Sequence, residues 1–200
     1  MDTRRAARKT PDERDGEIRG AARSIALEQG LVAVTQRAVA ARIGVAPALV
    51  THYRSSMEGL VVDTFRAIVA AELDEVRGAT QQGTARERLR ALVATALDPS
   101  RDAVTAVWVD AWSLGRRNAA LAAAVREQAD AWQRHAEELV TTGVAAGEFA
   151  DVEPARIAWL LLGLVDGLNA QSVIHDRHDP RRAAVVLSAV ERELGVASGA

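Results

Sequence analysis

The sequence contains no cysteine and only one lysine, Lys9, among its 200 residues. The absence of cysteine excludes disulfide bonds, thiolate zinc sites and cysteine nucleophiles, and it fits an intracellular setting. Aromatic residues are also scarce, with one tyrosine, two phenylalanines and four tryptophans. The opening stretch MDTRRAARKTPDERDG is basic at its start but lacks the apolar core of a secretory signal. We therefore expect a cytoplasmic protein.

Long apolar runs are missing as well. The best one, IAWLLLGLVDGL, is short and carries Asp166, so the sequence predicts no membrane-spanning helix. The chain is 48% hydrophobic and 26% charged, which indicates a globular protein of one or two domains. Its net charge of −2 hides an asymmetry, because residues 1–54 carry +4 (ten basic, six acidic) and the remainder −6 (15 basic, 21 acidic). A basic N-terminal unit on an acidic body is typical of a protein that binds a polyanion.

The pattern of helix formers predicts an all-α fold. Alanine, leucine, arginine and glutamate dominate, and no segment alternates with period two. Capping boxes at Thr10–Glu13, Ser55–Glu58 and Thr84–Glu87 mark three helix starts, and Asp179 with Pro180 caps the last helix. The predicted helices cover residues 11–28, 35–42, 46–53, 57–79, 85–98, 100–115, 118–146, 154–175 and 180–194.

The most specific residues of the N-terminal third lie in one bend, RIGVAPALVTHYRSSMEGL, at residues 42–60. Gly44 permits the positive φ that ends the first short helix, and Val45 inserts from the turn into the core. Val39, Ala40 and Ile43 lie on one face of that helix, and Leu49 and Val50 hold the second short helix against it. The outward positions of the second helix are then Pro47, Ala48, Thr51 and His52.

Two short helices joined by a tight turn and packed on a preceding helix form a helix-turn-helix. Such a unit places its second helix in the major groove of DNA, with phosphate contacts around it. Pro47 and Ala48 suit close approach to bases, and the helix start at Thr35 suits a phosphate. The predicted DNA-binding residues are Thr35, Gln36, Ala46, Pro47, Ala48, Thr51, His52, Tyr53 and Arg54. An unrelated three-helix bundle with a chance turn is the structural alternative.

This stretch resembles the TetR family of bacterial repressors over residues 14–65. The matching residues are Thr35, Val39, Ala40, Gly44, Val45, Ala46, Leu49, His52, Tyr53, Glu58 and Leu60. Arg54 stands where the family usually has an aromatic residue, and Ala48 stands where glycine is common. Met57 replaces a phosphate-binding lysine, a contact that Arg54 is expected to supply in part. The resemblance implies a DNA-binding domain at residues 1–56, followed by a ligand-binding and dimerisation domain at 57–200.

The C-terminal helices predict a dimer independently of this resemblance. The helix at 154–175 is apolar almost all round, so it needs a second partner besides its own core. Gly163 and Gly167 allow a neighbouring helix to approach closely, and the helix at 180–194 adds a second apolar face. The predicted interface comprises Leu160, Gly163, Leu164, Gly167, Val185 and Leu187. A larger monomeric core is the alternative explanation of the same pattern.

All four tryptophans lie in the C-terminal part of the chain. Core filling is the simpler interpretation of any one of them, whereas together they predict an aromatic-walled cavity for an organic cation. The predicted ligand-binding residues are Trp108, Trp112, Trp132, Trp159, Asp166 and Asn169. Asp110 is set aside because its spacing directs it away from the stripe that carries Trp108 and Trp112. Residues 104–170 also resemble the C-terminal domain of choline-sensing, BetI-type repressors, through the segments AVWVDAWSLGRRNAALAAAVREQ and GVAAGEFADVEPARIAWLLLGLVDGL.

The sequence thus predicts a homodimeric repressor that binds a palindromic double-stranded operator and is released by a small-molecule effector. No acid–base pair, nucleophile elbow, phosphate loop or metal-ligand spacing stands out, so we predict neither an enzyme nor a cofactor or metal site. Three alternatives remain open. They are an effector-independent regulator or activator, an all-α enzyme that uses the tryptophan-lined cavity, and an interaction scaffold.

Overall fold

The computed structural model describes residues 9–175 and 179–196, and these residues form helices without strands. The elements are α1 (Pro11–Gln29), η1 (Leu31–Ala33), α2 (Gln36–Ile43), α3 (Pro47–Tyr53), α4 (Met57–Ala79), α5 (Ala85–Ala96), η2 (Pro99–Arg101), α6 (Asp102–Gly115), α7 (Ala119–Ala145), α8 (Pro154–His175) and α9 (Arg182–Glu193). The predicted all-α fold is confirmed, and each helix lies within about two residues of its expected bounds.

Two of the three predicted capping boxes are present. The Thr10 and Thr84 side chains each accept the N–H of the glutamate three residues on, and those glutamates accept the N–H of the capping threonine. The third box is wrong by one residue, because Ser56 rather than Ser55 caps α4 and accepts the N–H of Gly59. Asp179 accepts the N–H of Arg181, but the N-cap of α9 is Arg181 and the helix begins at Arg182, so the expected start at residue 180 is corrected by two residues. Between the two predicted helices, residues 176–178 lie outside the described residues.

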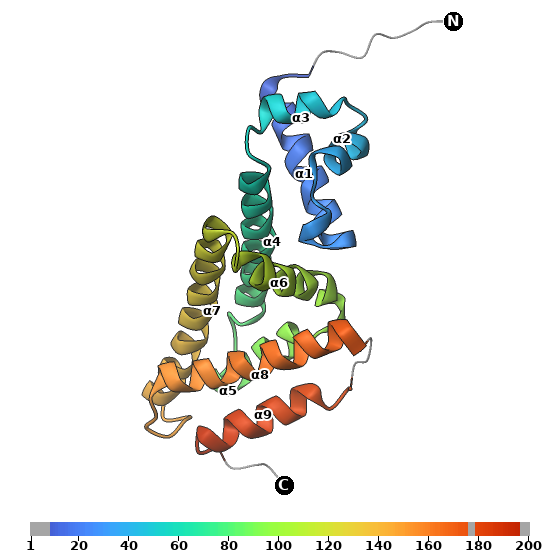
Figure 1. Cartoon of the computed structure of the whole chain (residues 1–200). Coiled ribbons are helices and arrows are strands. Elements are labelled where there is room, and N and C mark those ends of the chain that lie inside the picture. Colours follow the sequence, from blue (N-terminus) through green and yellow to red (C-terminus); the bar gives the residue numbers. More distant parts are fainter. Residues whose placement is uncertain (1–8, 176–178, 197–200) are drawn as a thin grey trace, which may run out of the picture.

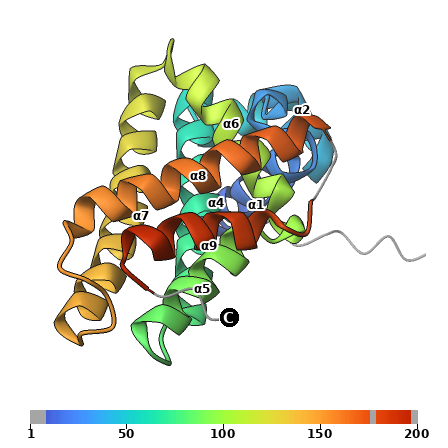
Figure 2. The ribbon, with the colours of Figure 1, turned by 90° about the horizontal axis from the view of Figure 1, so that it is seen from below.

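The helices are arranged as a small head and a larger body (Figure 1). Helices α1, α2 and α3 form the head at one end, and α4 runs from it into the body. Helices α8 and α9 lie side by side at the opposite end, across α4 and α5 in the view from below (Figure 2). The expected division after residue 56 falls directly before Met57, the first residue of α4, and stays a prediction.

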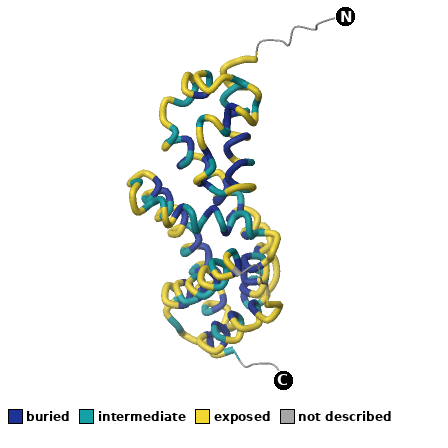
Figure 3. Tube along the Cα trace, turned by 45° about the vertical axis from the view of Figure 1, so that its right-hand side comes forward, coloured by how far each residue is buried: buried dark blue, intermediate teal, exposed yellow. Residues whose placement is uncertain are grey.

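Head and body share buried side chains rather than meeting through a flexible linker. One hydrophobic cluster contains Ile18 and Ile25 of α1, Phe65 of α4 and both Val107 and Ala111 of α6. The second cluster fills the space between α5, α7, α8 and α9. Figure 3 shows buried residues continuing from the head along α4 into the body. Because α4 and α6 pack directly on the head, a movement of either helix is transmitted to the head.

Candidate functional sites

The head contains the predicted helix-turn-helix. Thr35 caps α2 by accepting the N–H of Ala38 at 3.2 Å, and Gly44 ends it with φ 67° and ψ 40°. This left-handed conformation is available to glycine at little cost. Pro47 occupies the first turn of α3, where its missing N–H costs no hydrogen bond. Val50 is fully buried and fixes α3 on the rest of the head.

The outward side of α3 is open to solvent, as the sequence pattern predicts. Ala46, Pro47, Ala48, Thr51 and His52 are all exposed. These side chains are small or able to form hydrogen bonds, so α3 offers a surface that can approach base edges closely.

The structure gives Gln36 and Arg54 internal partners. Gln36 donates from Nε2 to the Pro47 carbonyl at 2.8 Å and to the Thr51 hydroxyl, which ties α2 to α3. Arg54 pairs with Asp15 of α1 at 2.7 Å and with Asp63 of α4 at 3.0 Å. The expectation that Arg54 replaces the missing lysine as a phosphate contact is therefore corrected, because its guanidinium is already held by two carboxylates.

Arg37 is a candidate phosphate contact that the sequence analysis missed. It lies in the first turn of α2, two residues after the Thr35 cap, and it is exposed. No ion pair to Arg37 occurs within the described part of the chain. The signal was present in the sequence, because a positive side chain beside free helix N–H groups suits a phosphate. The exposed His52 stacks edge-on against Tyr53, with ring centroids 5.3 Å apart.

The body encloses a pocket of about 270 Å³ between α4, α6, α7 and α8. All six residues predicted to bind a ligand line it, namely Trp108, Trp112, Trp132, Trp159, Asp166 and Asn169. Trp108 and Trp112 lie on α6 with ring centroids 6.0 Å apart, and Trp132 comes from α7. Trp159 lines the pocket from α8 and is 75% exposed, so the pocket is open on this side. The tryptophans thus line a cavity instead of only filling the core.

Glu72 of α4 is a second acidic group in this pocket, and the sequence analysis missed it. Its carboxylate accepts the indole N–H of Trp108 at 3.1 Å, and Arg101 lies 3.8 Å away. Burial raises the pKa of Glu72, which Trp108 and Arg101 only partly offset. The signal was its position, because residue 72 follows Phe65, Ile68 and Val69 at the spacing of the buried face of α4.

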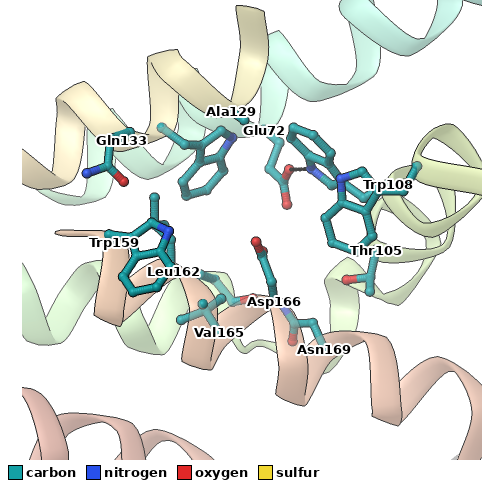
Figure 4. A pocket seen from close by; sticks show the side chains of 14 residues that line it. Glu72, Thr105, Trp108, Ala129, Gln133, Trp159, Leu162, Val165, Asp166 and Asn169 are labelled. Atoms are coloured by element: carbon teal, nitrogen blue, oxygen red, sulfur yellow. Dashed lines mark hydrogen bonds between the residues drawn. The ribbon is translucent and has the colours of Figure 1, made fainter. Parts of the chain in front are cut away.

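Asp166 projects into the pocket from α8, toward the carboxylate of Glu72 (Figure 4). Although part of the residue is exposed on the open side of α8, the surrounding protein desolvates its carboxyl group and raises its pKa to about 6. A cation placed between Glu72 and Asp166 would offset the cost of burying the two carboxylates and would screen their mutual repulsion.

The amide of Asn169 is less available than the sequence suggested. It donates to the Ala96 carbonyl at 2.9 Å and accepts from Arg182 at 3.3 Å, so it fastens α8 to α5 and α9. The Trp132 indole N–H, by contrast, is buried and has no hydrogen-bond partner within the described residues. A ligand oxygen is the kind of acceptor that this donor lacks.

Asp110 of α6 points away from the pocket, as its spacing predicts. Its Oδ2 accepts the backbone N–H of Leu31 in η1 at 2.8 Å. The residue therefore joins the body to the head.

One face of α8 and α9 is apolar and uncovered. Trp159, Ile174 and Val185 are 75%, 76% and 60% exposed, and an added Cβ at Gly163 or Gly167 would meet no atom within 4 Å. Of the other predicted interface residues, Leu160, Leu164 and Leu187 are half-buried, and the last two pack on the body core. Gly163 also belongs to the pocket wall.

By length and composition alone, Pro154–Ile174 is apolar enough to cross a membrane. The expectation that this apolar run is too short to span a bilayer is therefore corrected on length. Ile157, Leu161 and Val165 are nevertheless buried against the body, as in a core helix of a folded domain.

Comparison with known proteins assigns the chain to a family. A model described as bacterial regulatory proteins of the tetR family matches residues 18–64, and a model described as the C-terminal domain of BetI-type transcriptional repressors matches residues 85–195. The chain belongs to the TetR family. As a member of this family, it is a DNA-binding transcriptional regulator and not an enzyme.

Individual relatives agree with this assignment. The TetR-family chain is 29% identical over 164 residues to the HTH-type transcriptional regulator BetI of Rhizobium meliloti (strain 1021), covering 80% of this chain and 78% of that protein. A transcriptional regulator from Rhodococcus sp. Rha1 has the same fold, with a TM-score of 0.78, 20% identity and coverage of 95% and 100%. So does a regulator from Saccharomonospora viridis crystallised in complex with choline, with a TM-score of 0.77, 21% identity and coverage of 92% and 96%.

Proposed function

We propose that this regulator is a homodimeric repressor that leaves its operator when an organic cation occupies the pocket. The observation that carries this proposal is the set of four tryptophans around Glu72 and Asp166. Each part of it, namely operator contact, dimerisation and effector release, has its own structural support. Because its target is DNA, we expect the protein to act in the cytoplasm.

Operator contact is assigned to the exposed side of α3. Ala46, Pro47 and Ala48 would approach base edges, while Thr51 and His52 lie farther along the same helix. Thr35 and Arg37 at the start of α2 would anchor flanking phosphates. Two such heads, related by a two-fold axis, fit a palindromic operator with half-sites about one helical turn apart.

Dimerisation is assigned to the uncovered face of α8 and α9. A second copy of the chain supplies an identical apolar face, so Trp159, Ile174 and Val185 would be removed from water on both sides. Gly163 and Gly167 permit close approach of the partner helix. Pairing of this kind also covers the open side of the pocket beside Trp159, which would strengthen electrostatic contacts within it.

The effector is assigned to the class of alkylammonium cations that carry an oxygen. Each cation–π contact to an indole contributes about 0.5–2 kcal/mol, and the two carboxylates supply the opposite charge. The free N–H of Trp132 would donate to the oxygen. Choline has both groups, and a neighbour of the same fold was crystallised with it.

We expect effector binding to release the protein from DNA because two of the helices that line the pocket also contact the head. Glu72 is part of α4, which starts directly after the head, and Trp108 is part of α6, which packs on the head. A cation that binds more tightly to one arrangement of α4 and α6 shifts the population toward that arrangement. The spacing of the two heads, and hence operator affinity, then changes.

The test uses choline and its uncharged isostere 3,3-dimethylbutan-1-ol. Choline is expected to quench or shift tryptophan fluorescence and to weaken binding to an operator selected from random DNA, whereas the isostere does neither. Asp166→Asn should lose the choline response, and Asp130→Ala, an exposed carboxylate of α7, should retain it. Unchanged operator affinity at saturating choline would leave an effector-independent regulator as the function.

A further inference from the structure

Helix α6 has one side in the pocket and another against the head. Trp108 and Trp112 line the pocket, whereas Val107 and Ala111 are fully buried in the cluster shared with α1 and α4. Asp110 is two residues from each tryptophan, which places it about 200° away around the helix. A rigid tilt of α6 that moves the indoles therefore also moves the carboxylate of Asp110.

The contact that Asp110 makes with the head is specific. Its Oδ2 accepts the N–H of Leu31 at 2.8 Å, and Leu31 is only 1% exposed, within the head's core. Gly30 precedes it with φ 85°, and an ideal Cβ there would lie 2.5 Å from the same Oδ2. Residue 30 thus satisfies two conditions, a left-handed backbone and room for the carboxylate, which only glycine meets.

We propose that Asp110 is a positioning residue that sets the orientation of the DNA-binding head on the body. The carboxylate fixes the N–H at the junction of α1 and η1, and α6 carries this attachment. Without an effector, the contact holds the two heads of a dimer at one spacing. The proposal has a second part, which rests on the proposed function. When a ligand occupies the pocket, α6 moves, and Asp110 transmits this movement to the head.

The geometry favours this contact over the apolar packing between α6 and the head. The apolar packing of Val107 and Ala111 on the head is non-directional and tolerates small shifts. A hydrogen bond from a backbone N–H to a charged acceptor depends steeply on distance and angle. Leu31 lies in the short η1 turn just before α2, so its placement affects the first helix of the helix-turn-helix.

The experiment compares the wild-type protein with Asp110→Ala and Gly30→Ala, with Asp130→Ala as the matched charge control. Asp130 is exposed on α7 and lies in neither site. Thermal melts and sedimentation confirm that each variant folds and has the oligomeric state of the wild type. Asp110→Asn, which keeps the shape and one acceptor oxygen, serves if either variant fails to fold.

The first measurement needs no effector. Operator duplexes with the half-site spacing lengthened or shortened by one or two base pairs are titrated with each protein. We expect wild type and Asp130→Ala to lose at least about tenfold in affinity when the spacing is wrong, and Asp110→Ala and Gly30→Ala to lose less than about threefold. Equal discrimination by all four proteins would overturn the proposal.

The second measurement adds choline. Asp110→Ala and Gly30→Ala should both bind choline within about twofold of wild type. Choline should nevertheless weaken their operator binding by less than about threefold, against about tenfold or more for wild type. Release identical to wild type in both variants would refute the coupling role. If wild type itself does not respond to choline, the proposed effector is wrong, and the spacing measurement still decides the role of Asp110.

Discussion

Lowering the pH should weaken effector binding because the pocket carboxyl groups take up protons. Burial raises the pKa of Asp166 to about 6 and also raises the pKa of Glu72. A cation is attracted by the ionised carboxylate, so binding is strongest above the pKa and is lost as the pH falls through it. With a pKa of about 6, Asp166 is almost fully ionised at pH 7.5 and about one tenth ionised at pH 5.

This titration sets the size of the effect. If only the ionised form binds, the apparent Kd for choline rises about tenfold between pH 7.5 and pH 5, which corresponds to about 1.4 kcal/mol. Protonation of Glu72 adds to the loss with the same sign. At an ordinary aspartate pKa near 3.9, the same interval would change the Kd by less than about 10%.

Isothermal titration calorimetry at pH 7.5, 6.5, 5.5 and 5.0 measures this dependence, with circular dichroism confirming that the protein stays folded. Asp166→Asn should bind choline weakly at every pH and flatten the profile. Its stability at pH 7.5 should not fall, because the substitution removes a desolvated charge that has no salt bridge within the described residues. A pH-independent Kd for the wild-type protein would refute the role assigned to these carboxylates.

Four further substitutions test the fold and the assembly. Gly44→Ala should lower the free energy of unfolding by about 1–2 kcal/mol, because φ is 67° at this position although the space around it is open. Gly20→Ala, in the exposed middle of α1, should raise the free energy of unfolding by about 0.5–1 kcal/mol. Urea denaturation measures both changes. Phe65→Ala should cost about 3–5 kcal/mol in the same assay, because the ring is fully buried and lies 5.1 Å from that of Trp108; a cost below 1 kcal/mol would contradict this packing. Val185→Arg should produce monomers in sedimentation at micromolar concentration, and a retained dimer would place the interface elsewhere.

Local signals in the sequence predicted most of the fold. The Thr10 and Thr84 capping boxes and Gly44 depend on residues within one turn of each other, so their spacing alone locates the helix ends. The capping at Ser55 failed for a related reason, because two adjacent serines offer the same chemistry. The capping serine must have an extended backbone conformation, and the path of the chain after α3 decides that this residue is Ser56.

Tertiary contacts account for the side chains whose roles the sequence did not indicate. Arg54 meets Asp15 and Asp63 only once α1, α3 and α4 are packed, so no sequence spacing relates the three. Glu72 is a similar case, because its apolar neighbours mark it as buried but do not show that it faces Trp108. The tryptophans are easier to assign, since large aromatic side chains spread over three helices of a small bundle have few places to lie.

The account rests on one link, namely that a cation in the tryptophan pocket lowers the affinity of α3 for DNA. Fluorescence anisotropy of a labelled operator, titrated with the protein in the absence and presence of saturating choline, tests it most directly. The prediction is two chains per duplex, with an apparent Kd at least about tenfold higher when choline is present. Coincident titration curves, recorded where calorimetry shows the pocket to be filled, would contradict it.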